Sequence, residues 1–119
     1  MLRPDKLVAY VRTRQELDEL ADALGPALGA MRAHGVPFTA EIAGDGLLSW
    51  AVDPPRGASI TSWRAWLTLR AARAIWTAKT LGAREPSWRF ALRRLVLEGV
   101  DITTWSPRGE RRSRSAWDW

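Results

Sequence analysis

Two short runs of alternating apolar and polar residues lie near the middle of the chain, on either side of a glycine-rich segment. In residues 38–43, FTAEIA, apolar side chains recur with a period of two, which predicts a strand with one apolar face. The segment 44–46, GDG, can adopt the positive φ angles of a tight hairpin turn. Residues 47–52 are the expected partner strand, and 53–55, DPP, end it because proline has no N–H to donate to a sheet.

Apolar residues at intervals of three and four predict a first helix between residues 13 and 35. Thr13 and Glu16 match a capping box with Thr13 as the N-cap, and Gly35 is a suitable left-handed C-cap. Gly25 and Pro26 fall inside the pattern, so we expect a kink or two stacked segments there. The expected buried stripe consists of Leu17, Leu20, Ala21, Leu24, Leu28 and Met31.

A second helix is expected from Ser59 or Ser62, either of which can be its N-cap, to about Leu81, with Gly82 closing it. Its main apolar stripe consists of Trp63, Trp66, Leu67, Ala71, Ala74, Ala78 and Leu81. Leu69 and Trp76 lie off this stripe. The helix is therefore apolar on more than one side, which predicts that it is sandwiched or contacts a partner.

A third helix is expected to start at residues 85–87, EPS, and to end at Gly99. Trp88, Leu92 and Leu95 share one of its faces, and arginines occupy the remainder. Most of the four tryptophans Trp50, Trp63, Trp66 and Trp88 are expected to be buried.

Short apolar runs at residues 6–11, KLVAYV, and 100–105, VDITTW, predict a first and a last strand. The resulting order β-α-β-β-α-α-β predicts an α+β fold, in which helices pack on one face of a small, mainly antiparallel sheet. Residues 1–105 are expected to form a single domain. Residues 106–119 are polar and basic, so a mobile tail is expected there.

The chain has 119 residues and no cysteine, which excludes disulfides, thiolate nucleophiles and cysteine-ligated metal sites. Residues 1–6 do not resemble a signal peptide, and no apolar run approaches the roughly 20 residues of a membrane span. A cytoplasmic protein without membrane association is therefore expected. The net charge of +5 is uneven, because residues 1–59 have six basic and eight acidic side chains whereas residues 60–119 have twelve and five.

Three residues are candidate acids or bases: Lys79, His34 and Asp53. His34 lies at the end of a predicted helix, where a surface or capping role is the favoured alternative. Asp53 precedes a proline, where an aspartate usually shapes the turn. His34 is the only histidine and the carboxylates are not clustered, so neither a metal site nor a cofactor is expected.

Arg56 and Arg64 are the candidate phosphate- or peptide-binding residues, because a loop leading into a helix N-terminus presents free N–H groups to anions. Trp76, Trp117 and Trp119 are candidates for contact with a partner. Basic charge beside aromatic residues also fits nucleic-acid binding. No RNP-type strand, helix-turn-helix signature or KH loop is present, so that class is not favoured.

Three segments together resemble the C-terminal part of the HopA-type effector-like family. They are residues 4–11, PDKLVAYV, residues 36–55, VPFTAEIAGDGLLSWAVDPP, and residues 62–66, SWRAW, so the resemblance covers about residues 4–80. Related proteins occur in actinobacterial gene clusters for class V lanthipeptides and thioamitides. They are linked there to the dehydration of serine and threonine in a precursor peptide, beside a kinase-like protein.

The resemblance implies a small HopA-like subunit that assists phosphate elimination from a precursor peptide, in complex with a kinase-like or second lyase chain. Elimination needs a base, an acid and cations around the phosphate, and this chain supplies arginines for the last role. Two alternatives stay open. One is a non-enzymatic adaptor that binds a partner protein or peptide, and the other is a basic nucleic-acid-binding domain.

Overall fold

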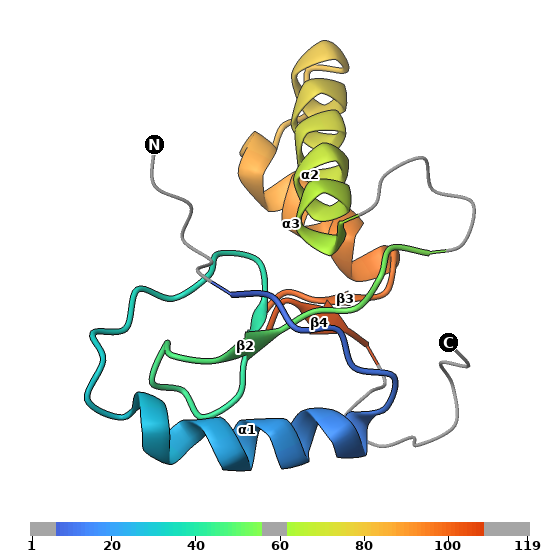
Figure 1. Cartoon of the computed structure of the whole chain (residues 1–119). Helices are drawn as coiled ribbons and strands as arrows, with labels where there is room; N and C mark the ends of the chain where they lie inside the picture. Colours follow the sequence, from blue (N-terminus) through green and yellow to red (C-terminus); the bar gives the residue numbers. More distant parts are fainter. Residues whose placement is uncertain (1–6, 56–61, 109–119) are drawn as a thin grey trace.

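The computed structural model describes residues 7–55 and 62–108. These residues form three helices and two separate antiparallel two-stranded sheets, so the fold is α+β, as predicted, but the single sheet that was expected does not form. In Figure 1, α1 lies at the opposite end of the molecule from α2 and α3, with the strands between them. The elements in order are α1 (Arg14–Leu28), β1 (Ala40–Glu41), β2 (Ser49–Trp50), α2 (Trp63–Thr80), α3 (Ser87–Leu97), β3 (Val100–Asp101) and β4 (Ser106–Pro107).

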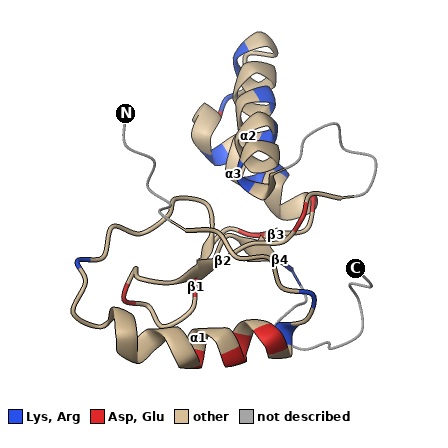
Figure 2. Ribbon diagram, viewed as in Figure 1, with Lys and Arg blue, Asp and Glu red and all other residues tan. Residues whose placement is uncertain are grey.

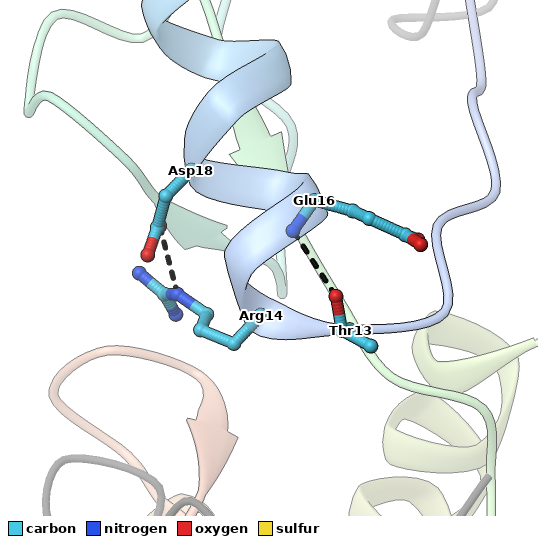
Figure 3. A network of polar contacts seen from close by, with 4 residues as sticks. All are labelled: Thr13, Arg14, Glu16 and Asp18. Atoms are coloured by element: carbon cyan, nitrogen blue, oxygen red, sulfur yellow. Dashed lines mark hydrogen bonds and ion pairs between the residues drawn. The ribbon is translucent and has the colours of Figure 1, made fainter.

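Thr13 caps the N-terminus of α1, as predicted. Its Oγ1 accepts a hydrogen bond of 3.1 Å from the N–H of Glu16 (Figure 3). The carboxylate of Glu16 accepts from the N–H of Arg12, at 2.7 Å, and not from the N–H of the N-cap itself. Arg14 and Asp18 form an ion pair of 2.9 Å one turn apart, a spacing that stabilises a helix by a few tenths of a kcal/mol.

α1 ends well before the predicted C-cap. It is one helix that includes Gly25 and Pro26, and it stops at Leu28 with Gly29 as C-cap, whereas the sequence pattern placed its end near Gly35. A tighter turn follows, in which the N–H of Met31 donates to the carbonyl oxygen of Leu28 at 2.8 Å, and the glycine at residue 29 disfavours continuation of the helix. No residue of α1 is buried, so the predicted stripe is covered only in part.

The β1–β2 hairpin is shorter than the alternating pattern predicted, because only Ala40 with Trp50 and Glu41 with Ser49 are paired. Gly44 and Gly46 have positive φ angles of 75° and 73°, so the predicted turn chemistry is confirmed. The prediction that the first strand of the hairpin starts at Phe38 was wrong. Phe38 has φ of 61° and follows Pro37 in a turn, as at the third position of a type II turn, so the extended conformation begins only after it.

α2 and α3 pack against each other and provide most of the core. Ser62 is the N-cap of α2, where its Oγ accepts from the N–H of Ala65 at 3.3 Å, and this confirms one of the two expected caps. Gly82 and Gly99 have positive φ angles and follow the two helices, as predicted. The buried cluster consists of Val52, Trp63, Trp66, Leu67, Leu95 and Val100.

The predicted last strand at residues 100–105 is limited to β3. Asp101 turns the chain, because its Oδ1 accepts from the N–H of Thr103 at 2.9 Å and its carbonyl oxygen accepts from the N–H of Trp105 at 2.7 Å. β4 then pairs with β3, and both Ser106 and Pro107 are buried. The domain boundary expected after residue 105 thus falls inside this hairpin. The rest of the expected tail, residues 109–119, lies outside the described residues.

The expected first strand was wrong over residues 7–11, which are described and form no strand. Leu7 and Tyr10 are 80% and 90% exposed. An isolated extended run has no neighbour to accept and donate its backbone hydrogen bonds, and its apolar side chains gain nothing when no second layer covers them.

Candidate functional site

α2 has two apolar faces, and within residues 7–55 and 62–108 only one of them is covered by other parts of the chain. Trp63, Leu67, Ala74 and Ala78 are buried on the inner face. Four further residues recur at intervals of four, three and four on the other face, and we call them the outer stripe: Ala65, Leu69, Ala72 and Trp76. Leu69 is half-buried and the other three are exposed, with Trp76 at 73%. The exposure of Trp76 agrees with the sequence pattern.

An open apolar groove of about 180 Å³ lies between α2 and α3, and we call it the helix groove. Leu67, Ala71 and Ile75 of α2 line one side of it, and Trp88 and Leu92 of α3 belong to the other side. Of the four tryptophans that were expected to be mostly buried, Trp63 and Trp66 are in the core, whereas Trp88 is 56% exposed. Ala71 also lines this groove, and its small side chain leaves the space beside Trp88 unfilled.

Two aromatic residues from outside the helices, Phe38 and Trp105, complete the lining of the helix groove. Their rings meet edge to face, with centroids 5.0 Å apart and an interplanar angle of 90°. Both residues have left-handed backbones, with φ of 61° and 59°, which is uncommon for bulky side chains. The Nε1–H of Trp63 donates to the carbonyl oxygen of Trp105 at 2.9 Å and fixes that backbone to the start of α2.

Positive charge surrounds both surfaces. Residues 63–97 contain eight basic side chains and one acidic side chain, Glu85, and Figure 2 shows the basic residues gathered on α2 and α3 while acidic residues line α1. Arg93 pairs with Glu85, and Arg70 pairs with Glu98 at 3.3 Å while its guanidinium lies 5.5 Å from the Trp66 ring centre. Five of the basic residues have no carboxylate partner among the described residues: Arg73, Lys79, Arg84, Arg89 and Arg94.

The three candidate acids and bases lie on separate elements. His34 is in the connection from α1 to β1, Asp53 follows β2, and Lys79 is in the last turn of α2. All three are exposed, and no hydrogen bond or ion pair joins any two of them among the described residues. These three residues therefore do not form an acid–base pair with one another.

The predicted anion site is described only in part. Arg64 is half-buried in the first turn of α2, while Arg56 lies outside the described residues, as do Trp117 and Trp119. Arg70, further along α2, is paired with Glu98. The pairing of Arg56 and Arg64 around one phosphate stays a prediction.

The helix groove was missed by sequence reasoning. One signal was present, because Trp88 and Leu92 share a face of α3 while the corresponding face of α2 has alanines at residues 71, 74 and 78. A large residue opposite small ones leaves space between two helices unless other side chains fill it. The contribution of Phe38 and Trp105 had no such signal, because it depends on their positive φ angles.

In residues 7–55 and 62–108, no helix is long and apolar enough to cross a membrane. The same residues hold no group of three or more histidine, aspartate and glutamate side chains that could bind a metal ion. No protein-family model, no curated protein and no solved structure matches the chain.

Proposed function

We propose that this protein is a non-enzymatic adaptor that binds a partner protein through the outer stripe of α2. The observation that supports this most directly is the exposure of Trp76, 73%, at the end of a stripe of apolar residues. A tryptophan side chain buries about 150–250 Å² when it is covered, and tryptophan is enriched among the residues that dominate interfaces. Leaving such a side chain in water gives up a large part of that gain unless a partner covers it.

The spacing of the outer stripe indicates the shape of the partner. Apolar residues at intervals of four and three are the pattern with which one α-helix packs along another. Ala65 and Ala72 are small, which lets a second helix approach α2 closely at two points of the stripe. The partner segment is therefore an amphipathic helix.

The charges beside the outer stripe indicate the character of that helix. Arg73 lies four residues after Leu69 and Lys79 three residues after Trp76, so both are neighbours of the stripe on the helix surface. Neither has a carboxylate partner among the described residues. A second copy of α2 on this face would bring like charges together, whereas a helix with acidic flanks would neutralise them.

The other two classes of function are less well supported. A nucleic acid would use the cations of α2 and α3, but the apolar outer stripe offers no group that binds phosphate. The HopA-like role in phosphate elimination stays a prediction, because His34, Asp53 and Lys79 lie on separate elements and Arg56 is outside the described residues.

Replacement of Trp76 by alanine is expected to weaken partner binding about 30-fold, corresponding to roughly 2 kcal/mol for a central interface tryptophan. A photo-crosslinking amino acid in place of Ala72 first identifies the partner in the native host. Isothermal titration calorimetry with the purified partner then compares the wild-type chain with Trp76→Ala. The crosslinked segment is expected to be helical and acidic.

The matched control is Leu97→Ala, because Leu97 is an equally exposed apolar residue, at 73%, on α3. It should leave the affinity within about twofold of the wild type, as most exposed side chains outside a hot spot do. Equal losses in both variants, a basic partner segment, or crosslinking to nucleic acid in place of protein would each contradict the proposal.

A further inference from the structure

The helix groove lies on a different face of α2 from the outer stripe, with Lys79 at the border between the two, and its shape and surroundings point to a second binding site. We propose that it binds one large apolar side chain, of the size of phenylalanine, from an acidic peptide segment of a partner protein. This site goes beyond the adaptor function proposed above and does not depend on Trp76.

The volume of the groove limits the size of the side chain that can bind in it. An engineered apolar cavity of about 150 Å³ is known to hold one benzene molecule. The helix groove has about 180 Å³ and is lined only by apolar side chains, so one phenyl ring or branched aliphatic side chain fits it. The partly exposed indole of Trp88 forms an edge of the groove that a bound side chain would cover.

The two aromatic rings at the groove are held in fixed positions by the surrounding chain. Phe38 and Trp105 both lie in turns of the chain and have left-handed φ angles of 61° and 59°. The Trp63 hydrogen bond and the edge-to-face contact hold the two rings in this position. Because the rings are already held in place, binding a side chain against them would order little further structure.

The charged side chains at the rim of the groove indicate which kind of residue flanks the inserted side chain. Lys79 lies four residues after Ile75, on the adjoining surface of α2, and Arg89 follows Trp88, with its guanidinium carbon 5.3 Å from the Trp88 ring centre. Neither side chain has a carboxylate partner among the described residues. Carboxylates next to the inserted residue would therefore meet cations on both sides of the groove.

Peptide binding to the helix groove can be measured through the tryptophan side chains of the protein. Chain labelled with ¹⁵N-tryptophan is titrated with the acetylated, amidated pentapeptide Glu-Glu-Phe-Glu-Glu, and the indole N–H signals are followed by NMR. The signals of Trp88 and Trp105 are expected to shift saturably, while that of Trp76 stays in place. A pentapeptide with central alanine should cause no shift, and one with glutamine flanks should bind about fivefold more weakly.

Ala71→Leu tests the groove directly, because Ala71 lines the groove and the larger leucine side chain would fill it. This variant should lose the shifts, whereas Ala72→Leu, one residue further on and outside the lining, should keep them. Circular dichroism establishes that both variants are folded. A second filling variant, Ile75→Phe, is used if Ala71→Leu does not fold.

Three results would overturn this proposal: no saturable shift at Trp88 and Trp105, equal shifts at Trp76, or unchanged binding by a folded filling variant. Equal binding of the glutamine-flanked peptide would overturn the acidic part of it. The Trp76→Ala chain should bind the pentapeptide like the wild type. A failure at the groove is therefore distinguishable from a failure of the proposed docking at the outer stripe.

Discussion

Replacement of Trp63 by alanine is expected to lower the free energy of unfolding by about 4 kcal/mol, which is a typical loss for a buried tryptophan. Trp63 is 5% exposed, stacks on Trp66 with ring centres 5.1 Å apart, and donates its indole N–H to the carbonyl oxygen of Trp105. It thus connects the start of α2 to the β3–β4 hairpin. Chemical denaturation followed by circular dichroism measures the loss.

Trp63→Phe separates the hydrogen bond from the packing. The phenyl ring retains most of the apolar contact but leaves the Trp105 carbonyl oxygen without this donor, at a cost of about 1–2 kcal/mol. Trp76→Phe is the matched control, because Trp76 is exposed and its substitution should change the stability by less than about 0.5 kcal/mol. A loss below 1 kcal/mol in Trp63→Ala would show that this residue does not hold the two parts together.

Replacement of Leu67 by alanine is expected to cost about 3 kcal/mol, because Leu67 is among the largest fully buried side chains of the described residues. It belongs to the main buried cluster and also lines the helix groove. The cavity left by the substitution would merge with the groove, so the surrounding side chains could close around it only in part. Thermal and urea denaturation provide the measurement.

Leu24→Ala in α1 is the control for this substitution. Leu24 also lies on the apolar stripe of a helix, but it is half-buried, and alanine is a better helix former. The expected loss is under about 1 kcal/mol. If the two leucines contributed equally, α1 would be part of the main core, in disagreement with its lack of any buried residue.

The helices were the part of the fold that local patterns predicted well. Thr13 and Ser62 were identified as caps from their own chemistry, and Gly82 and Gly99 as residues after helix ends, because each of these interactions is confined to a few neighbouring positions. α1 was expected to extend too far because the apolar stripe continues to Met31. The turn at Gly29 ends it instead.

The strands were predicted less well because pairing depends on distant residues. Residues 7–11 have the composition of a strand and find no partner, whereas Ser106 and Pro107 look like part of a polar tail and pair with β3. Asp101 explains this second case, since its side chain reverses the chain after only two strand residues.

The candidate site was predicted in part. The exposure of Trp76 follows from its position off the buried stripe, a property of one helix alone. The helix groove combines α2 and α3 with Phe38 and Trp105, which are far apart in sequence and reach it through unusual backbone angles. No local pattern contains that information. The acid–base candidates were chosen by residue type, and the fold places them on separate elements.

The separation of charge between α1 and the two C-terminal helices also affects how fast a partner is found. Glu16, Asp18, Glu19 and Asp22 lie on α1, at the opposite end of the molecule from the uncompensated cations (Figure 2). Such a distribution gives the described part of the chain an electric dipole, and the field of an approaching acidic protein turns α2 and α3 toward it before contact. Long-range orientation raises the association rate most at low ionic strength, since salt screens charges beyond about 10 Å. The same acidic helix would repel a negatively charged partner that approached from the wrong end.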